Sequence, residues 1–179
     1  MGPAKAGQAA GQVAGAPTIV FLTTDMLLSR FIRWLTKSPV SHVALGLTLE
    51  GVPVLLQADI GGVQITLRES FLKKHKLVSE YAFTSPGIEN ALARGVREIG
   101  ERYDYVGLVG FFVVVVGRLL GRRIKNPLAS RKAVVCSEFI VGLDREGFCV
   151  PDWRGLDPET TTPGELLAIC RGSSAFRRV

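Results

Sequence analysis

An alternating apolar stretch, followed by a short turn and a second apolar stretch, constrains the fold of this chain most. In SHVALGLTL the odd-numbered residues of 43–49 are large and apolar, whereas the even-numbered residues of 42–48 are smaller or more polar. Glu50-Gly51 follows as a two-residue turn signal, and VPVLLQAD then runs back as a second stretch. The alternation predicts a β-hairpin whose first strand is half-buried, with its apolar side chains on one face.

The length of that turn also predicts which residues lie across from each other in the hairpin. A two-residue turn at Glu50-Gly51 places Asp59 directly opposite His42. Gln57 then lies one diagonal away on the same face. We therefore expect both side chains to lie within reach of the His42 imidazole.

The remaining pattern predicts one α+β domain. With 179 residues and 47% hydrophobic content, the chain can bury one substantial core over residues 18–179, behind a flexible tail of residues 1–17. The stretch 73–76 is basic and is predicted to be irregular. Further strands are predicted over 18–22 and 63–67, and helices over 26–37, 88–102, 164–169 and from Cys136 to a stop at Gly147.

The most apolar segment spans residues 106–121 and is followed by further basic residues up to position 125. Its sixteen residues fall short of the roughly 20 that cross a bilayer. We predict a buried core helix, with contact to an anionic membrane surface through 106–125 as the alternative. The net charge of +6 is spread along the chain without an aromatic-interleaved motif, so no nucleic-acid partner is expected.

The pair of Cys136 and His42 carries the candidate chemistry. Unpaired N–H groups at a helix start stabilise a thiolate, which makes Cys136 the candidate nucleophile, and its own N–H a candidate oxyanion donor. His42, on the more polar face of its strand, is the candidate base. Asp59 and Gln57 are both candidates for orienting the imidazole: Asp59 is electrostatically stronger, whereas Gln57 offers only an amide oxygen.

The other histidine and cysteines are interpreted as having no catalytic role. His75 lies in the basic sequence KKHKL and is expected at the surface. Cys149 and Cys170 have no favourable helix start beside them and are expected to be structural. Three cysteines without a C-x-x-C pair favour a reduced compartment, and the N-terminus lacks the apolar core of a signal peptide. A cytoplasmic location, with membrane association as an option, is expected.

Several segments in order resemble a known family of hydrolases. SHVALGL, LLQADIGGVQI, YDYVGL, VVCSEFIVGL and TTPGELL are similar to successive pieces of the circularly permuted NlpC-type papain-like cysteine hydrolases, whose relatives include the lecithin:retinol acyltransferase-like proteins. The resemblance covers residues from about 18 to 170. It implies a papain-like fold, in which an antiparallel sheet or barrel packs against a helix that bears the nucleophile.

The same resemblance implies the roles of individual residues. It gives Cys136 as the nucleophile, His42 as the base and Gln57 at the polar third position, where relatives often have an acidic residue or histidine. Tyr103, Tyr105 and Ser41 are expected to line the substrate cleft. No metal or organic cofactor is implied, because a thiolate, an imidazole and backbone donors suffice for acyl transfer.

These observations predict a cysteine hydrolase or acyltransferase that cleaves an amide or ester bond through a thioester intermediate. A peptide, as in peptidoglycan, and an acyl lipid are the two substrate classes expected. The alternative function is a non-catalytic module that binds a membrane surface or a protein, which the glutamine at position 57 and the positive charge favour.

Overall fold

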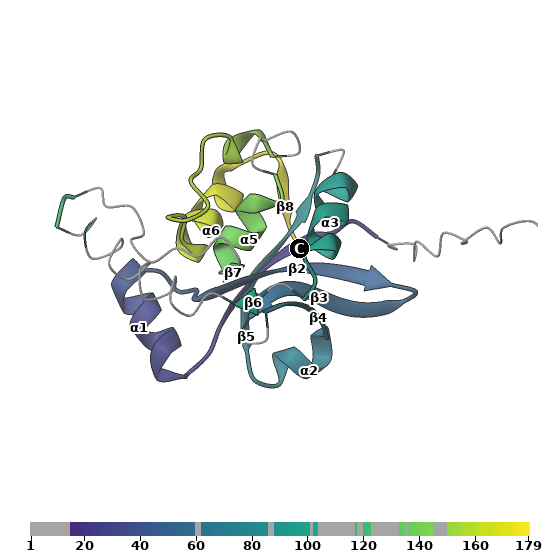
Figure 1. Cartoon of the computed structure of the whole chain (residues 1–179), viewed down its shortest axis with the longest axis horizontal. Coiled ribbons are helices and arrows are strands. Elements are labelled where there is room, and N and C mark those ends of the chain that lie inside the picture. Colours follow the sequence, from purple (N-terminus) through teal and green to yellow (C-terminus); the bar gives the residue numbers. More distant parts are fainter. Residues whose placement is uncertain are drawn as a thin grey trace, which may run out of the picture.

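The computed structural model describes residues 15–59, 62–85, 88–100, 102–103, 117, 120–122, 133–134, 136–144 and 150–179. A six-stranded antiparallel sheet forms its centre, in the order β4-β3-β2-β1-β5-β8, and β6 and β7 form a short parallel pair (Figure 1). The strands are β1 (Thr18–Thr23), β2 (His42–Leu49), β3 (Val52–Asp59), β4 (Gly62–Leu67), β5 (Lys76–Phe83), β6 (Arg102–Tyr103), β7 (Ala133–Val134) and β8 (Phe176–Arg178).

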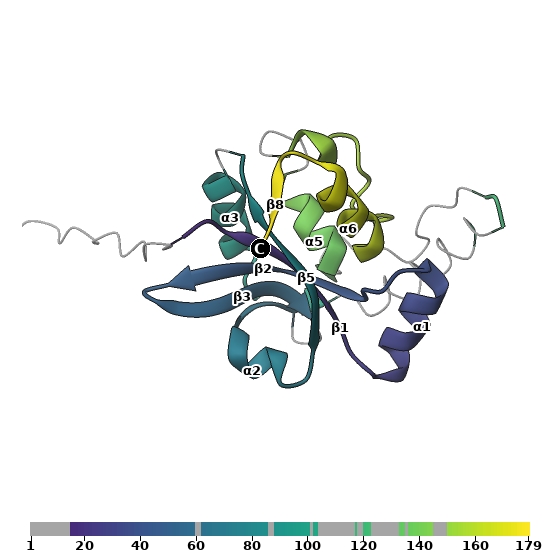
Figure 2. The ribbon, with the colours of Figure 1, turned by 180° about the vertical axis from the view of Figure 1, so that it is seen from behind.

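Helices cover both faces of the sheet. Helices α5 and α6 lie on one face and α2 lies on the other, while α1 extends from one end of the molecule (Figures 1 and 2). The helices are α1 (Leu27–Thr36), α2 (Arg68–Leu72), α3 (Ile88–Arg97), α5 (Cys136–Gly142), the 3-10 helix η1 (Pro151–Trp153) and α6 (Pro163–Gly172).

The predicted hairpin and its register are confirmed. Leu49 pairs with Val52 and Leu45 pairs with Leu56, as a two-residue turn requires. Both turn residues have positive φ, 49° at residue 50 and 83° at Gly51, which is the backbone of a type I′ turn. This turn matches the twist of the two strands and fixes which side chains share a face.

The prediction that β2 is half-buried is wrong, because both of its faces are covered. Val43 and Leu45 belong to the large apolar core on the side of α5 and α6. Ala44 belongs to a smaller apolar cluster on the other side, against which Phe71 and Leu72 of α2 pack. Helix α2 was not predicted from the sequence, and it is the element that closes the second face.

The predicted papain-like fold class is also wrong. The sheet is open: β5 pairs with the second edge of β1, β8 pairs with β5, and β4 and β8 are left as the two edges of the described sheet. Strand β1 is therefore central. The sequence analysis predicted no strand between residues 68 and 87, so it missed β5. The helix that begins at Cys136 spans only seven residues and ends at Gly142, before the predicted stop.

The core on the α5 and α6 side is apolar and ties the C-terminal elements to the sheet. Trp153 of η1 lies against Phe83 of β5 and Phe176 of β8. The centroid of the Trp153 ring is 6.1 Å from the ring centroid of each phenylalanine. A capping box between Thr162 and Glu165 starts α6. The three-residue strand β8 is thus held by side-chain packing as well as by its backbone pairing.

Several predictions fall on residues outside the described part. These are the tail up to residue 14, Tyr105, Cys149 and most of the segment 106–121; of Tyr103 only the backbone in β6 is described. Among the helices within the described ranges, none combines the length and apolarity that crossing a bilayer demands.

Candidate functional site

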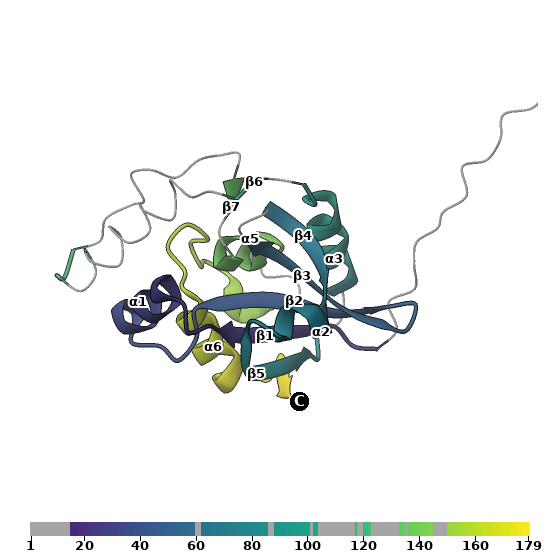
Figure 3. The ribbon, with the colours of Figure 1, turned by 90° about the horizontal axis from the view of Figure 1, so that it is seen from below.

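Strands β2 and β3 separate at the end of the hairpin that lies far from its turn. Their recorded pairing stops at Leu45 and Leu56. Beyond this point the β2 residues pair with β1, whereas the β3 residues pair with β4. Helix α5 packs against both strands, and Figure 3 shows it above the place where they diverge. The start of β2, the end of β3 and the start of α5 therefore meet at one place.

The His42 imidazole is held by an amide of β3. Its Nε2 lies 2.7 Å from Gln57 Oε1, and Gln57 Nε2 donates to Thr66 Oγ1 over 3.1 Å. With Gln57 Oε1 as the acceptor, Nε2 of the ring carries the proton and Nδ1 keeps its lone pair. Of the two predicted orienting groups, Gln57 is thus the one that bonds to the ring.

Burial decides the charge of this imidazole. Loss of solvent is the largest influence and lowers the pKa of His42 below its ordinary value of 6.5. The charge of Asp59 and the hydrogen bond to Gln57 raise the pKa, and the neighbouring His75 lowers it. The ring is consequently neutral at pH 7 and able to accept a proton.

Cys136 is the first residue of α5 and lies beside the strand that carries His42. Its side chain is buried, with 6% exposed, and hydrogen bonds from the backbone at Val43 and Ser137 reach its sulfur. Burial is the largest influence and raises the pKa of the thiol to about 11, against the lowering effect of these hydrogen bonds. The predicted thiolate is therefore wrong: desolvation outweighs the helix start, and the thiol is neutral at pH 7.

Asp59 acts on both groups through its charge. It raises the pKa of His42 and also that of Cys136, so its carboxylate lies close enough to affect both side chains. Asp59 was predicted to lie directly opposite His42, but the pairing of β2 with β3 stops at Leu45 and Leu56, and Asp59 pairs with Gly62 of β4 instead. The negative charge of Asp59 favours the protonated forms of both groups. It therefore stabilises the His42 imidazolium and disfavours the Cys136 thiolate.

The thiol and the imidazole approach from opposite faces of the sheet. His42 shares the face of Ala44, and its ring lies 5.8 Å from that of Phe71 in α2, whereas Cys136 belongs to the core on the other face. Within the described part of the chain no hydrogen bond joins Cys136 Sγ to the His42 ring. They are linked through Val43, which follows His42 and contacts the sulfur through its backbone.

His75 lies next to His42, which the sequence analysis missed. Its ring stacks on Phe71 with a centroid separation of 3.7 Å and an interplanar angle of 6°, and its centroid is 6.1 Å from that of His42. The predicted surface position is wrong, because the side chain is half-buried. The spacing of four residues between Phe71 and His75 is the signal that could have placed the two rings together.

Ser41 is buried, and its hydroxyl faces other hydroxyl groups. Its Oγ lies 2.6 Å from Ser29 Oγ in α1 and 3.4 Å from Thr23 Oγ1. This network joins the start of α1 to the residue before His42. Ser41 was predicted to line the substrate cleft, and its hydroxyl instead bonds within the protein.

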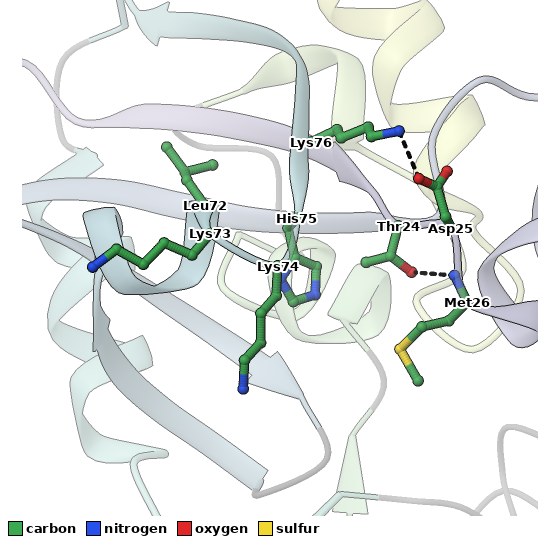
Figure 4. Close-up of a pocket in the computed structure, with 8 residues that line it drawn as sticks. All are labelled: Thr24, Asp25, Met26, Leu72, Lys73, Lys74, His75 and Lys76. Carbon is green, nitrogen blue, oxygen red and sulfur yellow. Dashed lines mark hydrogen bonds and ion pairs between the residues drawn. The ribbon is translucent and has the colours of Figure 1, made fainter.

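A cavity of about 470 Å³ lies beside this site, between the end of β1 and the turn that leads into β5 (Figure 4). Its wall is rich in lysine, and Lys76 forms an ion pair with Asp25 at 2.6 Å. His75, whose ring centroid is 6.1 Å from that of His42, is one of the residues that line the cavity. The lining residues are Thr24, Asp25, Met26, Leu72, Lys73, Lys74, His75 and Lys76.

The described residues hold no group of three or more His, Cys, Asp or Glu side chains that could bind a metal ion. No protein-family profile matches the sequence, and no curated protein matches it. Among solved structures, the chain is similar to the metalloprotein yiiX from Escherichia coli O157:H7, which carries the family label DUF1105. The identity is 16% and the TM-score 0.49, over 92% of this chain and 95% of that one.

Proposed function

We propose that this protein is a cysteine-dependent hydrolase or acyltransferase that uses Cys136 as nucleophile and His42 as base. The observation that carries the proposal is the hydrogen bond of 2.7 Å from His42 to Gln57, beside the strand residue whose backbone contacts the Cys136 sulfur. This bond orients the neutral imidazole of the residue before Val43, whose backbone contacts the neutral thiol of Cys136. The two groups form the starting state for general-base attack.

The reaction begins with the loss of the thiol proton. As the sulfur of Cys136 forms a bond to the substrate carbonyl carbon, the proton passes to Nδ1 of His42. The resulting imidazolium is stabilised by Gln57 and by the charge of Asp59. It then gives the proton to the leaving amine or alcohol, which departs and leaves a thioester on Cys136. Water or a second acceptor cleaves the thioester in the reverse sequence of proton transfers.

The start of α5 supplies backbone donors for the developing negative charge. The first N–H groups of a helix have no partner within the helix, and those at Cys136 and Ser137 lie next to the attacking sulfur. Donors placed at this point stabilise the oxyanion of the tetrahedral intermediate. Because sulfur and imidazole are not hydrogen-bonded in this state, attack also requires a side-chain rotation at residue 42 or 136, as in many unliganded sites.

The substrate is a carbonyl compound with a peptide or an acyl-lipid body. Both classes remain part of the proposal, because the chemistry at Cys136 is the same for an amide and an ester. The lysine-lined cavity next to His75 favours a substrate with a negative charge in either class.

Trapping of the thioester tests the proposal directly. The full chain would be incubated with p-nitrophenyl acetate and p-nitrophenyl octanoate, and adducts located by mass spectrometry after digestion. We expect an acyl group on Cys136 that is absent in Cys136→Ala and at least about tenfold slower to form in His42→Ala. Cys170→Ala is the matched control, because burial also raises the pKa of this second buried thiol.

Equal acylation of Cys136 and Cys170, or an unchanged rate in His42→Ala, would contradict the proposal. The alternative of a non-catalytic binding module is favoured by one observation, the burial that holds the pKa of Cys136 at about 11. If no ester acylates Cys136 at any pH up to the thiol pKa, the binding module becomes the better explanation.

A further inference from the structure

The lysine-lined cavity beside His75 has the size of a small-molecule site. Its volume of about 470 Å³ lies within the range of roughly 300–1,000 Å³ that such sites occupy. All of its lining residues belong to the described part of the chain (Figure 4). Most of them are exposed, so the cavity opens to solvent: Asp25, Met26, Lys73, Lys74 and Lys76.

The charges that line the cavity are mostly positive. Three lysines and one aspartate give a net charge of +2. The aspartate, Asp25, is neutralised by Lys76 at 2.6 Å. Lys73 pairs with Glu69 at 3.3 Å, but both side chains are exposed and such a pair is worth little. Lys74 has no ion-pair partner among the described residues. An incoming anion therefore meets Lys74 unpaired and can recruit Lys73 from a weak pair.

Two further groups in the wall have hydrogen-bonding capacity to spare. Thr24 is 8% exposed, and its Oγ1 accepts from the N–H of Met26 over 3.3 Å, which leaves the hydroxyl hydrogen unused within the described structure. His75 is half-buried, and its Nδ1 donates to the carbonyl oxygen of Phe71 over 3.1 Å. No bond from a described residue reaches its Nε2, which becomes a donor once the ring takes up a proton. A buried hydroxyl with an unused hydrogen at a cavity wall indicates a ligand with acceptor oxygens.

We propose that this cavity binds a phosphate monoester. Such a group carries a charge of about −1.5 to −2 at pH 7 and three acceptor oxygens, which match the net charge of the lining and its several donors. Lysine binds phosphate as a point charge, whereas planar carboxylates favour the fork of arginine, and none of the lining residues is an arginine. Leu72 and Met26 offer apolar surface to the organic body of the ligand.

The bound group would lie close to the candidate catalytic site. His75 lines the cavity, and its ring centroid is 6.1 Å from that of His42. A phosphate beside His75 should raise the pKa of His42, as the charge of Asp59 already does. The binding inference stands on the cavity alone and does not depend on the proposed acyl transfer.

Titration of the full chain with phenyl phosphate tests the inference. Calorimetry should show binding of phenyl phosphate, and benzoate, which has the same ring and a single negative charge, should bind at least about tenfold more weakly. The chain has two histidines, so the ring signals of each can be followed by NMR. Phenyl phosphate should shift the signals of His75 more than those of His42, because His75 lines the cavity. Equal affinity for benzoate, or no shift at His75, would overturn the inference.

Matched variants locate the binding site. Lys74→Gln should weaken the binding of phenyl phosphate by about tenfold or more. Lys37→Gln removes the same charge at the end of α1, outside the cavity lining, and should bind as the unchanged protein does. Thr24→Val should also weaken binding, whereas Thr24→Ser keeps the hydroxyl and should not. Because Lys74 is exposed, the first comparison does not depend on a buried substitution. Equal affinities of the two lysine variants would reveal a general effect of charge and overturn the inference.

Two further probes identify the source of the phosphate. Glycerol 3-phosphate presents the group in solution, and vesicles of phosphatidic acid in phosphatidylcholine present it as a lipid headgroup. Binding of glycerol 3-phosphate that is lost in Lys74→Gln supports a soluble phosphate monoester. Co-sedimentation with the vesicles that is lost in the same variant, without binding of glycerol 3-phosphate, supports a lipid headgroup. If neither probe binds in a way that depends on Lys74, the inference is wrong.

Discussion

The two faces of the central sheet differ in what they bury. The face beneath α5 and α6 carries a continuous apolar core that includes Trp153 and Leu166. The face beneath α2 has only a small apolar cluster, flanked by polar groups that each have a partner: Gln57 with His42, and Glu80 with Arg68. The first face supplies most of the stability, whereas the second provides the imidazole and the groups that set its charge.

Where the two faces meet, the difference has a chemical consequence. Cys136 belongs to the apolar face, so burial keeps its thiol neutral, and His42 belongs to the polar face, where an amide and a carboxylate act on the ring. The pairing of β2 with β3 ends at Leu45, which lets groups from both faces approach. The proposed pair thus depends on the divergence of two strands more than on a cleft between domains.

The largest effect is expected from the apolar face. Trp153→Ala removes the ring that lies between Phe83 and Phe176, and it should lower the free energy of unfolding by about 3–5 kcal/mol. Trp153→Phe is the matched control, because it keeps an aromatic ring and removes an indole N–H that is buried without a partner in the described structure. Urea unfolding followed by circular dichroism measures both. A loss below about 1 kcal/mol for the alanine variant would show that this face is not the main source of stability.

On the polar face, Gln57→Ala should slow acylation of Cys136 by about tenfold to 100-fold, because the His42 ring loses the acceptor that orients it. Gln64→Ala is the control, since Gln64 lies opposite Gln57 on β4 and does not bond to the ring. Rates with p-nitrophenyl acetate would be compared across pH.

The same comparison gives the pH dependence. The lowered pKa of His42 leaves more than half of the rings neutral at pH 6.5, so the rate should fall at a lower pH than it would with an unperturbed imidazole. Gln57→Glu places a negative charge beside the His42 ring, which raises the pKa of His42. The fall in the acylation rate should therefore move to higher pH. A fall at the same pH in both proteins would mean that another group titrates.

The sequence predicts the hairpin well because its information is local. Alternation over residues 42–49 and the positive φ that Gly51 allows are enough to give the register, and the register brings Gln57 and Asp59 toward His42. None of these inferences needs a distant part of the chain.

The missing elements depend on contacts that no local pattern records. Strand β5 carries Lys76 and Glu80, which weaken its apolar alternation, and Glu80 is accommodated because Arg68 reaches it from α2. Helix α2 has only five residues, fewer than a periodic signal requires. Without these two elements the sequence pattern predicts an uncovered second face of the sheet and an exposed His75. Likewise, the neutral thiol of Cys136 follows from tertiary burial.

A smaller effect is expected from the ion pair on the polar face. Arg68 donates to both carboxylate oxygens of Glu80 at 2.7 and 2.6 Å, and these bonds lower the pKa of Glu80. Glu80→Gln should cost about 1–2 kcal/mol at pH 7. Because the folded pKa lies below the ordinary value of 4.5, this contribution is present above that pH and is lost as the pH falls through the folded pKa. Glu69→Gln, in the exposed pair with Lys73, should cost nothing measurable.

The smallest expected effect lies at the turn that separates the two faces. Glu50 adopts φ 49°, a left-handed conformation that asparagine accepts more readily, so Glu50→Asn should raise the free energy of unfolding by about 0.5 kcal/mol. Gly51→Ala is the opposite change: at φ 83° a Cβ is strained even though nothing lies within 4 Å of it, and stability should fall by about 1 kcal/mol. Neither residue touches the site, so both variants should acylate Cys136 at the rate of the unchanged protein when fully folded. A slower rate in the folded Gly51→Ala variant would mean that the register of the hairpin has shifted, because moving β3 by one residue sends Gln57 to the apolar face and leaves the His42 ring without its amide.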